Sequence, residues 1–340
     1  MTAYRFRATQ PREIETIQHF LAGVFRLSNE APEFDPKLMR WKYYEPRPGW
    51  SGSRSYVLER DGEIVSHGCV WPMPLITPSG TVTACQIIDW AASPRMPGAG
   101  MLLRREIEQR VEVSVAIGGS PDSLKVLPGA GYKTVASFRK FALVVRPWRQ
   151  FQRRPSRDWR GAAKLGRNIF RRIMPIRGLP PGWSVRPFDD FVEAPAQDYA
   201  GTARSRELYQ YLLSCPSGHL SAFALKKGER GAGFFLLNHM RGQTRLVDLQ
   251  VHSGNTGDWQ VAAAAVTHTA ARLPETCEIV ASSSLPRFAE AFTRAGYSSC
   301  ALQSVFLLDR SKALSGFELH ITPADFDDFF ADFPDHPFAA

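Results

Sequence analysis

The chain has 340 residues, of which 44% are hydrophobic and 22% are charged, and its formal net charge is +9. This is the composition of a globular protein long enough for two domains, and no apolar run approaches the roughly 18 to 20 residues of a membrane span. The 5 cysteines form no C-x-x-C pair, the 8 histidines show no H-x-x-x-H spacing, and no G-x-S-x-G elbow occurs, which argues against a metal site or a hydrolase. Because the N-terminus lacks an apolar signal core, we expect a cytoplasmic protein.

The first 145 residues predict alternating strands and helices. Residues 4–9 alternate as a strand does, and Arg12–Phe25 has helical apolar spacing. A second helix begins at Asp35-Pro36, a plausible cap and first position. Further elements are expected as strands over Ser55–Arg60 and Glu63–Trp71 with a hairpin at Asp61-Gly62, a strand over Thr81–Ala92, a helix over Gly100–Arg110, a strand over Val111–Ile117, a short helix over Pro121–Pro128 and one or two strands over Thr134–Val145.

A glycine loop, Arg95-Met96-Pro97-Gly98-Ala99-Gly100, joins the strand ending at Ala92 to the next helix. Strand, loop and helix in this order place backbone N–H groups at a helix N-terminus, which attracts phosphate. Gly98 and Gly100 keep the backbone accessible, and Arg95 adds a cation. The loop lacks the lysine of a P-loop and the G-x-G-x-x-G of a dinucleotide site. An ordinary glycine turn before a surface helix is the alternative.

The spacing of Arg95, Gly98 and Gly100 matches [RQ]-x-x-G-x-[GA] and resembles the pyrophosphate loop of the GNAT (GCN5-related N-acetyltransferase) superfamily. The order of the expected elements resembles the GNAT order as well. The resemblance implies acetyl-CoA or another acyl-CoA as cosubstrate, with no metal. It implies a CoA site formed by Trp90, Ala91, Ala92, Arg95, Met96, Pro97, Gly98, Ala99, Gly100 and Met101.

Acyl transfer to an amine needs a group that deprotonates or orients the amine. Asp89, in the strand before the loop, is the acid best placed to face the cleft as general base or amine-orienting group. A structural role stays open, because the second half carries Asp248 at the corresponding position. Glu59 and Glu63 are weaker candidates.

Aromatic residues supply the expected acceptor wall. Trp41, Tyr43 and Tyr44 lie in the second helix, which borders the acceptor pocket in the GNAT superfamily, although core packing is the alternative. Many GNAT proteins place a general-acid tyrosine four residues before the terminal Gly-aromatic pair, where this chain has Leu127. Tyr132 is expected in the core. Water, Tyr43 or Tyr44 must then protonate the thiolate, or this copy is a poor catalyst.

The positive charge is concentrated in one segment. Between Arg146 and Pro180 there are eleven Lys or Arg and one acid, which leaves the remainder of the chain at −1. We predict a partly helical basic linker that packs on acidic surface of its own chain. It lacks the defined motif of a nucleic-acid site, so no nucleic-acid partner is expected.

The second half repeats the first. Pro121–Tyr132 and Pro286–Tyr297 share their length, first residue and final Ala-Gly-Tyr. The second loop, Ser253–Gly257, has lost the arginine and the G-x-G spacing, and Asp258 repels phosphate. Expected elements are strands over Trp183–Phe188, Ala222–Leu225, Gly231–Asn238, Thr244–Val251 and Glu278–Ser282 and helices over Trp259–Arg272 and Pro286–Arg294.

The predicted fold is α/β with a mixed (α+β) sheet in two tandem GNAT-like domains. The expected divisions are 1–147 (acyl-CoA binding), 148–182 (basic linker), 183–312 (degenerate second domain) and 313–340 (acidic, Phe-rich tail). In the tail, Thr322-Pro323 is a helix start, and Phe326, Phe329, Phe330 and Phe333 are expected to dock on the second domain.

The implied function is transfer of an acetyl group from acetyl-CoA to an amine of a small molecule, amino sugar or peptide. The first copy is expected to be catalytic, the second structural or acceptor-binding, and the protein a monomer or homodimer. The alternative is a non-catalytic GNAT-fold binding or scaffold protein, associated with surface-polysaccharide biosynthesis through the wording W-K-Y-Y-E-P-x-P-G.

Overall fold

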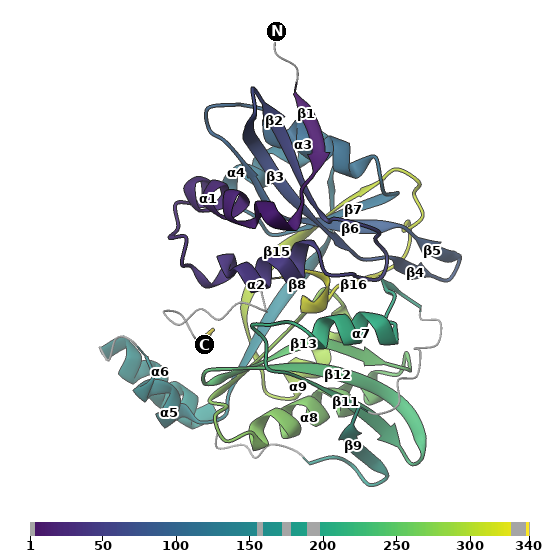
Figure 1. Cartoon of the computed structure of the whole chain (residues 1–340). Coiled ribbons are helices and arrows are strands. Elements are labelled where there is room, and N and C mark those ends of the chain that lie inside the picture. The colour runs from purple at the N-terminus through teal and green to yellow at the C-terminus, as the bar shows by residue number, and fades with distance from the viewer. Residues whose placement is uncertain (1–3, 155–158, 172–177, 189–197, 328–337, 340) are drawn as a thin grey trace.

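The computed structural model describes residues 4–154, 159–171, 178–188, 198–327 and 338–339, and one order of elements occurs twice in it (Figure 1). The first half contains β1 (Arg5–Ala8), α1 (Ile14–Phe25), α2 (Pro36–Tyr43), β2 (Ser55–Arg60), β3 (Glu63–Pro72), β4 (Leu75–Thr77), β5 (Gly80–Val82), β6 (Ala84–Ala92), α3 (Ala99–Glu108), β7 (Val113–Ile117), α4 (Pro121–Val126) and β8 (Lys133–Val144). The second half contains β9 (Trp183–Pro187), β10 (Ala200–Thr202), α7 (Arg206–Leu213), β11 (Leu220–Lys227), β12 (Arg230–Met240), β13 (Gln243–Val251), α8 (Thr256–Arg272), β14 (Glu278–Ser283), α9 (Pro286–Arg294), β15 (Ser298–Asp309) and β16 (Leu319–His320). Helices α5 (Pro147–Gln152) and α6 (Trp159–Arg171) connect the halves.

In the described part of the chain, strands of both halves form one 12-stranded sheet in the order β1-β2-β3-β6-β7-β15-β8-β14-β13-β12-β11-β9. β8 belongs to the first half but pairs with β14, and β15 belongs to the second half but pairs with β7. The two strands also pair with each other at the centre of the sheet. Each half therefore completes its sheet with a strand of the other, and the segments expected as two domains, 1–147 and 183–312, share that sheet.

Helices cover both faces of the sheet, and the alternation of strand side chains decides which helix each residue meets. On β6, Ile87 packs in the cluster that contains Leu103 of α3, whereas Ile88 packs with α1 and α2. On β12, Phe235 packs with α8 and α9, whereas Leu236 joins the cluster of α1, α2 and α7. The largest apolar cores thus lie on opposite faces of a sheet that both halves share.

Three further contacts join the halves. Trp41 of α2 stacks on Tyr211 of α7 with ring centroids 4.6 Å apart, and its indole Nε1 donates to the Tyr211 carbonyl at 3.1 Å. A small 4-stranded sheet, β16-β10-β4-β5, pairs the first-half hairpin with second-half strands. Phe326 packs edge-on against Phe138 of β8, at the seam between the halves. The other three tail phenylalanines named above lie outside the described residues.

Most predicted elements are confirmed, including the β2–β3 hairpin, where Asp61 and Gly62 have φ of 54° and 83°. The strand predicted over Thr81–Ala92 is wrong in one respect, because it divides into β5 and β6. Helix α7 and strand β15 were not predicted. None of the helices in the described ranges has both the length and the apolarity needed to cross a membrane.

The beginning of the basic segment is bound to the second half. Arg146 donates to the carbonyls of Ala271 and Leu273, and Arg149 donates to that of Pro274, all at 2.9 Å. These carbonyls lie at or just after the end of α8, where a helix leaves acceptors unpaired and its dipole favours cations. Arg153 pairs with Glu275 nearby. Part of the basic charge therefore caps a helix.

Candidate functional site

The candidate site lies where β6 and β7 separate. These parallel strands pair only over Ala84–Gln86. Beyond that point β6 contains a bulge in which Asp89 and Trp90 stand opposite Gly68 of β3, and Asp89 adopts a φ of 48°. A bulge bends its strand and redirects side chains, and φ in this range is strained for a residue other than glycine. The separation leaves a cleft of about 460 Å³.

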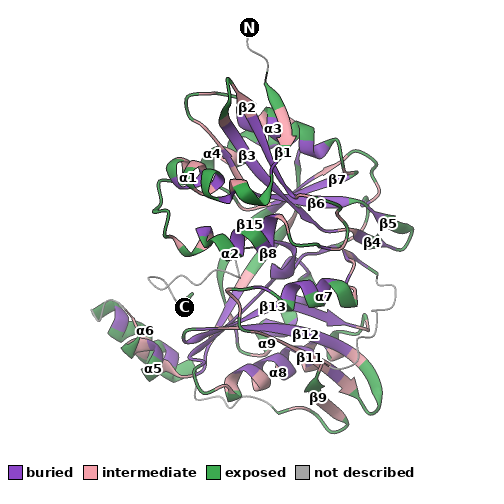
Figure 2. Cartoon of the chain, in the orientation of Figure 1, coloured by how far each residue is buried: buried purple, intermediate pink, exposed green. Residues whose placement is uncertain are grey.

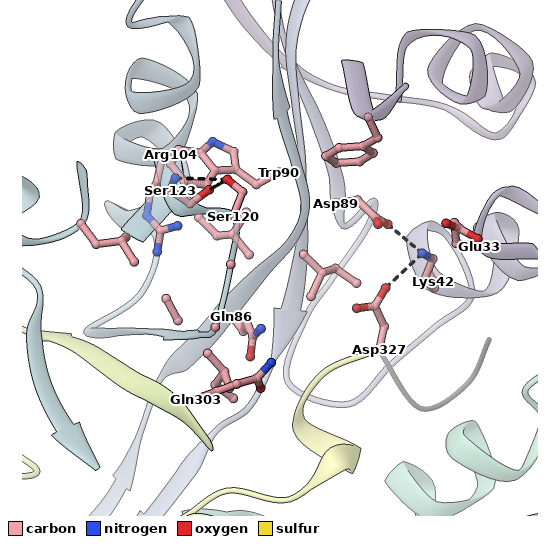
Figure 3. Close-up of a pocket in the computed structure, with 18 of the residues that line it drawn as sticks. Glu33, Lys42, Gln86, Asp89, Trp90, Arg104, Ser120, Ser123, Gln303 and Asp327 are labelled. Atoms are coloured by element: carbon pink, nitrogen blue, oxygen red, sulfur yellow. Dashed lines mark hydrogen bonds and ion pairs between the residues drawn. The ribbon is translucent and has the colours of Figure 1, made fainter. Parts of the chain in front are cut away.

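The cleft has two ends, on either side of β6 (Figure 3). The loop end, defined by Trp90, Arg104, Ser120 and Ser123, lies beside α3. The acidic end, defined by Glu33, Lys42, Asp89 and Asp327, lies beside α2. Gln86 and Gln303 lie at the base. Because Asp89 and Trp90 are adjacent on a strand and point to opposite sides, one bulge supplies a side chain to each end.

Helix α3 begins without a side-chain cap. Gly98 is its N-cap residue with φ of 86°, and the first turn contains no acidic residue. The first N–H groups of a helix have no partner within the helix, so this end remains suited to an anion. Gly100 permits close packing, because a Cβ there would lie 3.1 Å from the Ala92 Cβ and 3.4 Å from Trp90 Nε1. That indole nitrogen donates to the Gly100 carbonyl at 3.0 Å.

The remaining residues of the predicted CoA site divide into two groups. Arg95, Pro97 and Gly98 are exposed at the loop, with Met96 and Met101 half-buried beside them. Ala91 and Ala99 are buried in the cores on opposite faces of the sheet. Ala91 and Ala99 thus anchor the two ends of the loop, and the residues between them face solvent.

Arg104 lines the loop end and is buried. Its guanidinium lies 4.9 Å from the ring centroid of Trp90 and 4.6 Å from that of Tyr132. Its Nε donates to Glu108 at 2.7 Å, and the Tyr132 hydroxyl also donates to Glu108. Burial raises the pKa of Tyr132, which stays protonated. Tyr132 is therefore a core residue, as expected, and it positions Arg104.

At the acidic end, the Lys42 ammonium donates to Asp89 at 2.8 Å and to Asp327 at 3.0 Å, and the Tyr43 hydroxyl donates to Asp89 at 2.7 Å. Burial alone would lower the pKa of Lys42, but the two carboxylates raise it above its usual range. Burial would raise the pKa of Asp89, but Lys42 and the Tyr43 hydroxyl lower it. Asp89 is therefore ionised at neutral pH and holds a proton weakly, which suits orientation of a cation better than proton abstraction.

The expected acceptor wall lies elsewhere. Trp41 is at the contact between α2 and α7, Tyr43 is buried with its hydroxyl on Asp89, and Tyr44 hydrogen bonds to Thr9 Oγ1 at 2.8 Å. Among the described residues, none of these three lines the cleft. Leu127 does line it, at the position where many GNAT proteins have tyrosine. Glu59 accepts from Arg7 on the first strands, and Glu63 is exposed.

At the positions that match Ser123 and Leu127, the second half has large aromatic side chains. Phe288 and Phe292 correspond to Ser123 and Leu127, and they stack 4.2 Å apart, fully buried. Asn255 caps α8 with its side chain, accepting from Gly257 N at 2.8 Å. The aromatic side chains thus fill the region that corresponds to the cleft. At the start of α8 the Asn255 side chain accepts from a backbone N–H, whereas no side chain does so at the start of α3.

Several lining residues were not predicted from the sequence. Arg104 follows the predicted site residue Gly100 at i+4 on a helix, so helical spacing places the two side by side. Lys42 lies between the predicted residues Trp41 and Tyr43 in the sequence. Gln303 and Asp327 approach from the second half and the tail. Their sequence neighbourhood contains no signal, because Gln303 reaches the cleft through the exchange of β15 and Asp327 reaches it through an ion pair of the tail with Lys42.

No protein-family model matches the sequence, and no curated protein matches it either. Solved structures do resemble it. A GCN5-related N-acetyltransferase from Anabaena variabilis has a TM-score of 0.57 at 13% identity, over 90% of this chain and 73% of that one. A putative acetyltransferase from Pyrococcus horikoshii has a TM-score of 0.54 at 14% identity, over 94% and 93%. An N-myristoyltransferase from Saccharomyces cerevisiae, with bound myristoyl-CoA and inhibitors, has a TM-score of 0.58 at 10% identity, over 98% and 86%.

Proposed function

Because the chain has the GNAT acyl-CoA N-acyltransferase fold, we propose that it transfers an acyl group from an acyl-CoA, expected to be acetyl-CoA, to an amine. One observation carries the proposal: the uncapped N-terminus of α3 stands beside the cleft that opens where β6 leaves β7. The helix N-terminus offers hydrogen-bond donors for the phosphates of CoA, and the groove for the rest of the cosubstrate lies next to them.

The donor half of the reaction belongs to the loop end. The amides of Gly98, Gly100 and Met101 and the Arg95 cation hold the pyrophosphate, and the acyl-bearing arm enters the cleft past Trp90 and Arg104. A backbone N–H of the bulged segment of β6 polarises the thioester carbonyl, as donors do in any oxyanion site. The protein then contributes mainly positioning, which supplies on the order of 7 to 11 kcal/mol in favourable systems.

The acceptor half belongs to the acidic end. Three carboxylates, those of Glu33, Asp89 and Asp327, line this end, and the ammonium of Lys42 pairs with two of them, Asp89 and Asp327. This excess of negative charge favours a cationic amine. Asp89 orients the amine, which attacks the thioester as its neutral form. The bound ammonium first loses one proton to solvent. The C–N bond then forms as the C–S bond breaks, and the nitrogen releases its second proton to solvent.

The departing thiolate needs a proton from a group other than tyrosine. Leu127 has none to give, and the Tyr43 hydroxyl is engaged with Asp89. We assign Ser120 and Ser123, whose side chains line the loop end, the relay of a solvent proton to the sulfur. The second half supplies structure: it contributes Gln303, and its own loop is not expected to bind CoA.

Calorimetry with acetyl-CoA tests the binding step, using Gly98→Leu and a matched control, Gly52→Leu. Both glycines have positive φ, 86° and 78°, and a Cβ at either meets nothing within 4 Å. The two variants therefore carry similar backbone strain, but only Gly98 lies in the proposed phosphate loop. We expect Gly98→Leu to lose at least about tenfold in affinity, near 1.4 kcal/mol, and Gly52→Leu to bind as the wild type does.

Thiol release with a panel of amines tests the chemistry. Turnover with a cationic amine supports an acyltransferase, whereas no heat and no stabilisation at millimolar acetyl-CoA would remove the basis of the proposal. CoA binding without turnover on any amine would favour the non-catalytic GNAT-fold alternative, for which Leu127 is the supporting observation.

A further inference from the structure

Helix α6 carries three kinds of side chain on three sides. At about 100° per residue, Trp159, Ala163 and Phe170 project in nearly one direction, with Ile169 at the edge of that side. The cations form the neighbouring side and comprise Arg160, Lys164, Arg167 and Arg171. The third side holds Gly161 and Asn168, the buried residues of the helix.

The third side faces the protein. Asn168 Nδ2 donates to Gln150 of α5 at 3.1 Å, and Gln150 Nε2 donates to the buried Glu278 of β14 at 2.7 Å. Arg171 also donates to Ser298 Oγ at 2.8 Å. These polar contacts fix the rotation of α6 about its own axis, and the apolar side consequently points away from the body, from which α5 and α6 project (Figure 1).

The apolar side is open to solvent. Trp159 and Phe170 are each 75% exposed, which makes them the most exposed large hydrophobic residues of the described chain, and Ile169 is 51% exposed. On the neighbouring α5, Trp148 is 59% exposed. Figure 2 shows α6 largely exposed, in contrast to the buried central strands. Large apolar side chains gathered on one projecting element mark an interaction surface.

We propose that α5 and α6 dock on an anionic membrane surface, with α6 lying in the plane of the interface. In this position the rings of Trp159 and Phe170 enter the headgroup region, where Trp is favoured, and the four cations of α6 meet lipid phosphates. Each basic residue near such a surface strengthens binding about fivefold, and burial of the apolar side strengthens it further. The inference is independent of the proposed acyl transfer.

The charge of α6 favours an anionic membrane over two other binding partners, a second copy of the chain and nucleic acid. The described residues of α6 contain four cations and no acid, so the same face of a second copy would repel it. Nucleic acid would meet the cations, but phosphate attraction makes no use of an apolar side that includes Ile169. A negatively charged lipid surface is complementary to both sides at once.

Flotation of the full chain with vesicles tests the proposal. Phosphatidylcholine vesicles with phosphatidylglycerol are compared with vesicles of phosphatidylcholine alone. Trp159→Ser/Phe170→Ser removes the apolar side, and Arg160→Glu/Lys164→Glu reverses charge on the other. Leu302→Ser is the matched control, because Leu302 is 61% exposed on β15 and remote in sequence from α6. All of these side chains are exposed, so thermal unfolding should stay near that of the wild type.

We expect wild type and Leu302→Ser to float with the anionic vesicles and not with neutral ones. Arg160→Glu/Lys164→Glu should weaken binding by more than the roughly fivefold expected for each cation lost, and loss of the aromatic pair should weaken it at least about tenfold. Failure of the wild type to bind anionic vesicles at physiological salt would overturn the proposal. So would unchanged binding by Trp159→Ser/Phe170→Ser, which would identify a general polyanion site. Sedimentation as a dimer that the same variant converts to monomer would overturn it too, in favour of self-association.

Discussion

Asp89 and Asp248 lie at equivalent positions on β6 and β13 but have different partners and surroundings. Asp248 accepts from Arg204 Nε at 2.8 Å and from Thr322 Oγ1 at 2.8 Å, and it is fully buried. Asp89 lines the cleft and shares Lys42 with Asp327. The shared aspartate belongs to the repeated fold, and the partners around it determine whether it can meet a ligand.

The first prediction separates these two roles. Asp89→Asn should reduce kcat for amine acetylation by about tenfold or more while leaving Asp327 to pair Lys42. Asp248→Asn removes a carboxylate from buried Arg204, and breaking a buried pair costs about 3 to 5 kcal/mol. Denaturant unfolding and steady-state kinetics check both. Equal losses of stability in the two variants would mean that Asp89 is as structural as Asp248.

The second prediction concerns stoichiometry. We expect calorimetry to give one CoA per chain, because Phe288 and Phe292 fill the second cleft and Asn255 caps α8. Substituting Asp258, in the first turn of α8, with Asn should leave the count at one. Two equivalent sites in the wild type would show that the second loop binds CoA after all.

The third prediction tests the contribution of the exchanged strand. Gln303 lies at the base of the cleft but belongs to the second half. Gln303→Ala should raise KM for acetyl-CoA several-fold with little change in Tm, and Gln210→Ala, exposed on α7, serves as control. An unaltered KM for acetyl-CoA would show that Gln303 does not contribute to binding and that β15 has only a structural role.

The fourth prediction concerns residues 1–150 expressed alone. Without β15 and β14, strand β7 loses its partner on one edge and β8 loses its partners on both, and unpaired strand edges promote aggregation. We expect an insoluble or inactive fragment, judged by size exclusion and acetyl-CoA binding. A soluble, fully active fragment would show that the strand exchange is dispensable.

The fifth prediction is a loss of stability in mild acid. Burial lowers the pKa of His67 and of His320 to about 4, whereas an unfolded histidine titrates near 6.5. Between these values the unfolded state binds more protons, so the free energy of unfolding decreases as pH falls from about 6.5 to 4. Shifts of this size correspond to on the order of 3 kcal/mol each. Urea unfolding should show the decrease, His320→Gln should reduce it, and a flat profile would contradict it.

The sequence was sufficient for the local features of the site. The glycine spacing gave the loop, periodicity gave α3, and Asp61-Gly62 gave the hairpin, because each depends on neighbouring residues. It was not sufficient for Gln303 or Asp327, whose positions depend on which strands pair across the whole chain. Trp41 illustrates a different limit. An aromatic residue on a helix next to a site has the same pattern whether it faces a ligand or, as here, Tyr211.

The exchange of β8 and β15 also constrains synthesis on the ribosome. After β7 has been made, its outer edge has no partner until Ser298–Asp309 has emerged, long after the rest of the first half. The nascent chain must therefore keep an incomplete sheet in solution while the connector and nearly all of the second half are translated. Pairings between residues so distant in sequence form slowly, and edges that wait for them invite aggregation. Production of this protein should consequently depend on translation rate and chaperone supply more than its final stability suggests.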